Sequence, residues 1–174
     1  VVTATDEPAG RGKKINSSAV KKYAISNNLQ LLQPSNLKDE SFRKDLLNLK
    51  ADIFIVVAFR MLPKSIWNIP PKGTVNLHAS LLPHYRGAAP INWAIINGES
   101  HSGVTTFLID EKIDTGAILL QKKVEINDGD SAGELYEKLI DIGAKLTLKT
   151  INQIANQSII AKQQDNYSTQ LKSA

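Results

Sequence analysis

Three polar residues, Asn76, His78 and Asp114, are of types that suit an acyl-type transfer. Asn76 and His78 lie two residues apart in Thr74–Ala79, a run typical of a β-strand, so their side chains share one face. An amide can donate to an oxygen that becomes negative, and an imidazole can donate or move a proton near neutral pH. Asp114 can orient the imidazole or relay a proton through water. Spacing alone leaves purely structural roles open, because Asn-x-His pairs and Asp-Thr-Gly turns are common.

Alternating strands and helices are expected to position these residues. Strands are predicted at Leu29–Leu32, Asp52–Phe59, Thr74–Ala79, Gly103–Ile109 and Ile118–Ile126, and helices at Ser18–Asn27, Glu40–Lys50, Pro90–Asn97 and after a capping box at Ser131–Glu134. Asp6–Lys14, rich in glycine and proline, is predicted to be a loop. This order favours an α/β domain with parallel strands. Because ligands of such domains bind beyond the carboxyl ends of strands, the residues after Phe59, Leu77 and Ile109 are expected to gather there.

Composition narrows the class of protein. The 174 residues suit one domain, and a hydrophobic fraction of 42% allows a packed core. The chain has no cysteine, which excludes disulfides and a thiol nucleophile and is compatible with the cytoplasm. It has neither an apolar run of roughly 18 residues nor a signal-peptide pattern, so no membrane association is expected. A net charge of +4 is mildly basic and permits an anionic partner without requiring one.

Two longer segments carry a resemblance to a known family. Asn76–Glu99 (NLHASLLPHYRGAAPINWAIINGE) and Gly103–Leu119 (GVTTFLIDEKIDTGAIL) resemble the signature of the folate-dependent formyltransferases. The resemblance implies a Rossmann-like formyltransferase core, with a mostly parallel central sheet flanked by helices. It also implies that Asn76, His78 and Asp114 form the catalytic triad. Within the family, DEPAGRGKK and RGAAPINWAI most resemble the members that formylate methionine carried by initiator tRNA.

The resemblance further implies the substrates and the residues that bind them. The formyl donor is expected to be 10-formyltetrahydrofolate, the acceptor the amino group of methionyl initiator tRNA, and the protein a cytoplasmic monomer that needs no metal. The residues expected to bind folate are Phe59, Arg60, Met61, Leu62, Pro63, Ser80, Leu81, Leu82, Pro83, Ile109, Asp110 and Ile113. The cations expected to contact tRNA phosphates are Arg11, Lys13, Lys14 and Arg86.

The sequence departs from the family pattern in four places. Arg60 stands where many relatives have a small residue, and it either lines the pterin pocket or folds away. Lys112 stands where the family's D-x-G-x-D-T-G pattern has glycine. The family's first strand is expected to be missing from this catalytic domain of residues 1–174. Residues 158–174 are expected to form an extended tail that leads towards an absent C-terminal β-barrel domain.

Three alternative functions remain open. The same core could formylate another amine, such as a nucleotide-linked aminosugar or glycinamide ribonucleotide, although the GRGKK loop disfavours the latter. A metal hydrolase could use His78, His84 and His101 with Asp110 or Asp114, but no H-E-x-x-H signature is present. A non-catalytic RNA-binding module is disfavoured by the modest charge and the lack of an aromatic platform, since Tyr85 and Trp93 are interpreted as packing residues.

Overall fold

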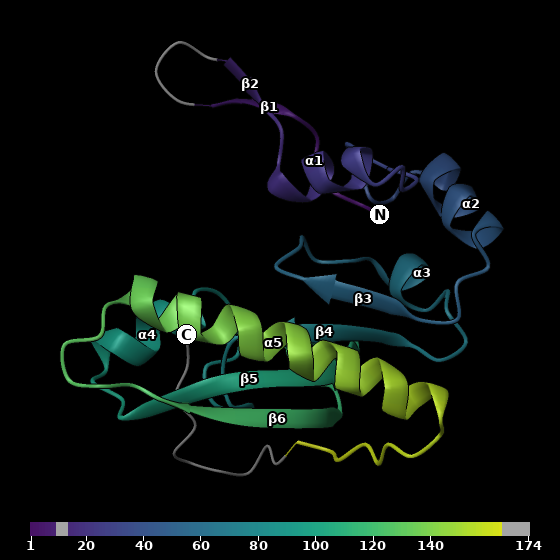
Figure 1. Ribbon diagram of the computed structural model, residues 1–174. Helices are drawn as coiled ribbons and strands as arrows, with labels where there is room; N and C mark the ends of the chain where they lie inside the picture. The colour runs from purple at the N-terminus through teal and green to yellow at the C-terminus, as the bar shows by residue number, and fades with distance from the viewer. Residues whose placement is uncertain (10–13, 165–174) are drawn as a thin grey trace. The chain divides into compact units, whose positions relative to one another are not determined.

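The computed structural model describes residues 1–9 and 14–164 (Figure 1). The chain divides into two compact units. One consists of Val1–Ala51 with Phe59–Ile69, and the other of Asp52–Ala58 with Pro70–Ala174. Among the described residues, no helix combines the length and hydropathy that a membrane-spanning segment requires.

The described residues of the first unit form two paired strands and three helices. Its elements are β1 (Glu7–Ala9), β2 (Lys14–Asn16), α1 (Ala19–Ser26), α2 (Glu40–Asn48) and α3 (Lys64–Trp67). The predictions for α1 and α2 are confirmed. The loop predicted at Asp6–Lys14 is wrong in part, because β1 and β2 pair antiparallel on either side of residues 10–13. The strand predicted at Leu29–Leu32 is reduced to a parallel bridge between Val2 and Leu32.

The second unit is a four-stranded sheet with two helices. Its elements are β3 (Phe54–Val57), β4 (Thr74–His78), α4 (Pro90–Ile96), β5 (His101–Leu108), β6 (Ile118–Glu125) and α5 (Ala132–Ala155). The strand order is β3-β4-β5-β6. The α/β assignment is confirmed, but the prediction of a mostly parallel sheet is wrong, because only β3 and β4 pair parallel. The segment joining β5 to β6 is too short for the crossover that parallel strands need, so these strands form a hairpin.

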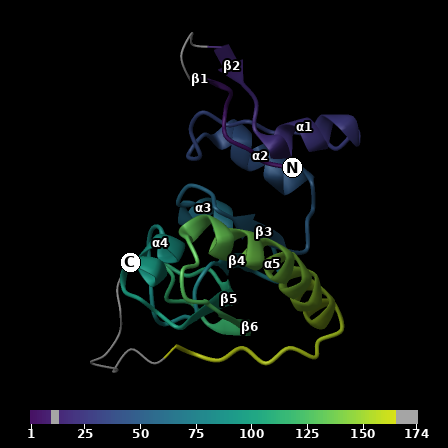
Figure 2. The same cartoon turned by 60° about the vertical axis from the view of Figure 1, so that its left-hand side comes forward.

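Helix α5 provides much of the core of this unit. Figures 1 and 2 both show it lying along the sheet. The buried apolar residues that meet there are Ala94, Val104, Val124, Leu135, Leu139 and Leu146. Gly143 allows the close approach, because a Cβ at this position would lie 2.9 Å from a methyl carbon of Leu77. The helix begins with the predicted capping box, in which Ser131 and Glu134 exchange side-chain to backbone hydrogen bonds.

Candidate active site

The carboxyl end of β4 supports the predicted catalytic residues, but not in the way that parallel strands would. His78 lies opposite Thr105 in the middle of β5, whereas Leu108 at the end of β5 lies opposite Val75 near the start of β4. The expectation that the ends of β4 and β5 meet at one edge is therefore wrong. Asp114 reaches His78 because residues 109–117 fold back sharply, and Gly116 marks the tightest point. An added Cβ at Gly116 would lie 1.7 Å from the carbonyl oxygen of Leu108.

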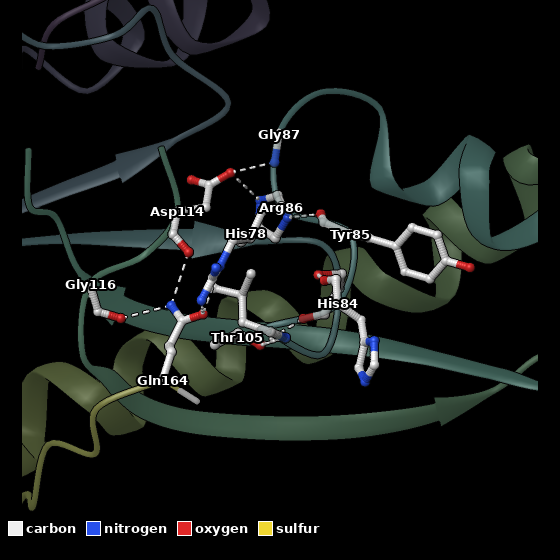
Figure 3. A network of polar contacts seen from close by, with 11 residues as sticks. His78, His84, Tyr85, Arg86, Gly87, Thr105, Asp114, Gly116 and Gln164 are labelled. Atoms are coloured by element: carbon white, nitrogen blue, oxygen red, sulfur yellow. Dashed lines mark hydrogen bonds and ion pairs between the residues drawn. The ribbon is translucent and has the colours of Figure 1, made fainter. Parts of the chain in front are cut away.

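The imidazole of His78 is buried and contacts one group at each nitrogen (Figure 3). Its Nε2 lies 2.7 Å from the carbonyl oxygen of Tyr85. Because a carbonyl oxygen only accepts hydrogen bonds, Nε2 carries a proton in this arrangement. Nδ1 faces the Oδ2 atom of Asp114 at 3.7 Å. This separation exceeds a direct hydrogen bond, so Nδ1 is the ring nitrogen left to interact with a substrate.

Asp114 is held by its backbone conformation and by a main-chain amide. Its φ angle is 52°, in the left-handed region that non-glycine residues rarely adopt. The amide of Gly87 donates a hydrogen bond of 2.8 Å to Oδ2, the atom that faces His78. The imidazole is thus oriented by the hydrogen bond that its Nε2 donates to the Tyr85 carbonyl, while the Asp114 carboxylate faces Nδ1.

Asn76 shares a face of β4 with His78 and is half-buried. It lies opposite Phe107 in β5 and Val56 in β3. Its amide forms no hydrogen bond with any residue that the structure describes. The Asn76 amide is therefore available to donate to a bound ligand.

The segment Ser80–Pro83, predicted to bind folate, is pinned to β5 by one hydroxyl group. Thr105 is fully buried, and its Oγ1 donates to the carbonyl oxygen of Ser80 at 2.6 Å and accepts from the amide of Leu82 at 3.2 Å. Ser80 is itself 1% exposed and donates from Oγ to the carbonyl oxygen of His84 at 2.6 Å. The side chains of Ser80 and Leu82 are therefore buried in the protein and hold the backbone of this segment in place. Leu81 and Pro83 are half-buried.

Tyr85 is a site residue that the sequence interpretation treated only as packing. Its side chain is 5% exposed, and its hydroxyl donates to Glu99 and accepts from the Asn97 amide. These contacts hold the backbone whose carbonyl binds His78, and the φ angle of Tyr85 is 57°. Turn-forming Gly87 hints at an unusual backbone here, but the sequence shows no pattern that would identify a carbonyl as a ligand of His78.

The loop before Asp114 contains the other predicted folate-binding residues of this unit. The carboxylate of Asp110 accepts from the hydroxyl of Thr115 at 2.8 Å and from the amide of Lys112 at 3.0 Å. Asp110 therefore closes the loop on itself, with Lys112 in place of the family's glycine. Ile109 is half-buried and Ile113 is exposed.

The predicted folate-binding run Phe59–Pro63 belongs to the first unit. The guanidinium of Arg60 lies 5.4 Å from the centre of the Phe59 ring and donates to the carbonyl oxygens of Pro34 and Ser35 at 2.8 and 3.1 Å. The Arg60 guanidinium thus contacts residues of its own unit. The Met61 side chain is 72% exposed. Leu62 and Pro63 are half-buried.

Two of the four cations predicted to bind tRNA lie outside the described part of the chain. Arg11 and Lys13 fall in residues 10–13, and of Lys14 only the backbone is described, in β2. The base of the β1–β2 pair is tied to α1 by an ion pair between Asp6 and Lys21. The hydrogen bond from Lys21 holds the pKa of Asp6 below its usual value. Arg86 is described, and its guanidinium donates to Gln164.

Metal ligation finds no support in the described residues. In residues 1–9 and 14–164, no group of three or more His, Cys, Asp or Glu side chains is placed to hold a metal ion. His101 is exposed and contacts Ser100, far along β5 from the Thr105 position that pairs with His78.

Comparison with known proteins relates this site to a family. Residues 1–151 match the family model described as formyl transferase. The chain is 59% identical to the methionyl-tRNA formyltransferase of Flavobacterium johnsoniae over 95% of this chain and 53% of the relative. It is 51% identical to that of Thermodesulfovibrio yellowstonii, over 99% of this chain and 57% of the relative. The chain thus spans about half the length of the curated relatives it matches.

Solved structures show the same fold. The N-formyltransferase of Helicobacter canadensis, in complex with folinic acid and dTDP-3-aminofucose, superposes with a TM-score of 0.72 at 29% identity, covering 97% of this chain and 57% of that one. Glycinamide ribonucleotide transformylase 1 of Symbiobacterium toebii matches in fold, with a TM-score of 0.71 at 19% identity over 83% of this chain and 74% of that one. Because the family model matches residues 1–151, which are most of the chain, the chain belongs to the formyl transferase family.

Proposed function

We propose that the full-length protein transfers a formyl group from 10-formyltetrahydrofolate to the amino group of methionine on initiator tRNA. The observation that carries the proposal is the 3.7 Å separation between Asp114 Oδ2 and Nδ1 of His78, a residue of the strand that also presents the Asn76 amide. Relatives named methionyl-tRNA formyltransferase at 59% and 58% identity support this acceptor. Solved relatives in complex with tetrahydrofolate or folinic acid support a folate donor.

The proposed reaction begins with attack of the methionine amine on the formyl carbon. A new C–N bond forms, and the carbonyl electron pair moves to oxygen. The Asn76 amide and a protonated His78 Nδ1 donate to this oxygen, and one such donor typically lowers a barrier by roughly 3–4 kcal/mol. Asp114 stabilises the positively charged ring, because its carboxylate faces Nδ1.

Asp114 also takes the proton that the attacking amine must lose, directly or through water. When the bond between the formyl carbon and the folate nitrogen breaks, that nitrogen receives the proton and the carbonyl reforms. The products are a formylated amine and tetrahydrofolate, and Asp114 returns to its starting charge. Because the donor is already activated by its nitrogen leaving group, no metal enters these steps.

The remaining expectations extend the proposal to binding. Within the second unit, folate would be held by the predicted residues of Ser80–Pro83 and Ile109–Ile113. Arg11, Lys13 and Lys14 would contact tRNA phosphates. The reaction would take place in the cytoplasm, where translation begins, with the protein acting as a monomer.

An acceptor assay tests the substrate. The full-length protein and the formyl donor would be offered methionyl initiator tRNA, a nucleotide-linked aminosugar and glycinamide ribonucleotide in parallel. Formylation of the tRNA alone is expected. Formylation of either small amine, with the tRNA left unmodified, would overturn the proposed acceptor and leave the formyl-transfer chemistry in place.

A second assay tests the catalytic residues. His78→Ala and Asn76→Ala are each expected to lower kcat about a hundredfold to a thousandfold, the usual cost of losing an oxyanion donor. His101→Ala is the matched control, because this histidine is exposed and its side chain hydrogen-bonds only with Ser100 among the described residues. Wild-type kcat in folded His78→Ala would refute the catalytic assignment.

A further inference from the structure

Gln164 is a buried amide whose hydrogen bonds converge on the site. It is 7% exposed, and its Nε2 donates to the carbonyl oxygens of Asp114 and Gly116 at 2.9 and 2.8 Å (Figure 3). Its Oε1 accepts from Nε and Nη2 of Arg86 at 3.1 and 2.7 Å. All of the usual hydrogen-bonding positions of the side chain are therefore used. The residue lies beyond the 1–151 region matched by the family model.

The backbone before Gln164 is held in a defined register. After α5, the chain returns to the start of β6, where Ile118 and Lys162 exchange amide to carbonyl hydrogen bonds of 2.7 and 2.8 Å. Gln164 follows this bridge by two residues and is buried, whereas Lys162 and Gln163 are exposed. The expected extended tail after Ser158 thus includes a stretch that packs back onto the second unit.

The groups bound by Gln164 belong to the two segments that contact His78. One segment contains Tyr85 and Arg86 and supplies the carbonyl on Nε2. The other contains Asp114 and Gly116 and supplies the carboxylate that faces Nδ1. The Gln164 amide therefore links these two segments. It binds the carbonyls of Asp114 and Gly116 through Nε2, and it binds the side chain of Arg86, the residue after Tyr85, through Oε1.

Asp114 has particular need of such a restraint. Its left-handed φ of 52° is costly for a residue with a Cβ and persists only where surrounding contacts enforce it. The Gly87 amide holds the carboxylate, whereas Gln164 holds the carbonyl of the same residue. Together these bonds restrain both ends of Asp114 relative to His78.

We propose that Gln164 is a positioning residue for formyl transfer, which sets the separation of Asp114 and His78 by binding the Asp114 carbonyl and the Arg86 guanidinium at once. The inference rests on the proposed function for its kinetic consequence. Its structural content, that Gln164 controls the surroundings of the His78 ring, is independent of the acceptor.

Two substitutions of Gln164 in the full-length protein distinguish the role of its Nε2 donor from that of its Oε1 acceptor. Gln164→Ala removes all of its hydrogen bonds. Gln164→Glu keeps an acceptor for Arg86 but presents oxygen to the carbonyls of Asp114 and Gly116, which cannot donate. Gln163→Ala is the matched control, because Gln163 is exposed and adjacent.

Both Gln164 variants are expected to lower kcat about tenfold to a hundredfold, the range that a misplacement near 1 Å produces, with little change in the KM of either substrate. Gln163→Ala should match wild type. A rise in KM at unchanged kcat would overturn the proposal, since it would indicate a lost substrate contact. Wild-type kcat in Gln164→Glu would also overturn it, and this variant retains the Arg86 contact should Gln164→Ala fail to fold.

Nitrogen NMR of the His78 ring, without substrates, gives a readout that does not depend on formyl transfer. Gln164→Glu should shift the Nδ1 and Nε2 resonances of His78, whereas Gln163→Ala should leave them in place. Unshifted resonances in the folded Gln164 variants would refute the positioning role. If the wild-type protein formylates no tRNA but Gln164→Glu still shifts the His78 resonances, the positioning role would be supported and only the proposed acceptor would be contradicted.

Discussion

Thr105→Val removes one hydroxyl from the centre of the site while keeping the shape of the side chain. The Thr105 hydroxyl donates to the Ser80 carbonyl and accepts from the Leu82 amide and from Nε2 of Gln121, at 2.6, 3.2 and 3.0 Å. Gln121 also donates to the Leu82 carbonyl at 2.8 Å, so its amide keeps a partner in the variant. Two backbone groups, the Ser80 carbonyl and the Leu82 amide, lose the Thr105 partner.

The expected loss of stability follows from those two groups. A buried group left without a hydrogen bond costs about 1–3 kcal/mol, and the added methyl offsets a fraction of this. Thr105→Val should therefore lower the free energy of unfolding by about 2–4 kcal/mol, as measured by urea denaturation followed by circular dichroism. Because Thr105 lies opposite His78, kcat should fall as well.

Thr147→Val is the control for the same change of atoms. The Thr147 hydroxyl donates only to the carbonyl of Gly143, one turn earlier in α5, at 2.8 Å, and the residue is half-buried. A helical carbonyl has its backbone partner as well, so this loss should cost less than about 1 kcal/mol. Equal losses in the two variants would refute the reasoning that the Thr105 hydroxyl organises Ser80–Pro83.

Two further predictions concern backbone space and charge. Gly116→Ala should unfold the site and abolish activity, because the new Cβ would lie 1.7 Å from the Leu108 carbonyl oxygen. Gly133→Ala is the control: its Cβ would have a hydroxyl oxygen at 3.7 Å as its nearest neighbour, so the urea midpoint should stay unchanged or rise. The hydrogen bond from Lys138 lowers the pKa of Asp130 from its usual 3.8, so this carboxylate contributes stability above that value that is lost as the pH falls below it. Asp130→Asn should therefore lose less stability than wild type between about pH 7 and pH 3, and equal acid sensitivity in urea titrations would contradict this.

Local sequence determined much of the secondary structure. Ser131 and Glu134 form the capping box that their spacing predicts, and Asn76 and His78 share a strand face because side chains alternate along β4. The motifs around His78 and Asp114 were also sufficient to identify the family, since specific residue types must recur wherever the same chemistry does. These features depend on residues that are close together in the chain, so the sequence alone is enough to predict them.

Tertiary structure decided which groups meet. β5 pairs antiparallel with β4, and this direction places Thr105, not the end of β5, opposite His78. The partner of His78 Nε2 is a backbone carbonyl, which every residue has, so no residue type could indicate Tyr85. Gln164 is 50 residues from Asp114 and looked like part of a polar tail, yet it becomes buried by the return of the chain to β6. The sequence therefore predicted the candidate catalytic side chains, while the long-range contacts that set their geometry arose only when distant segments packed together.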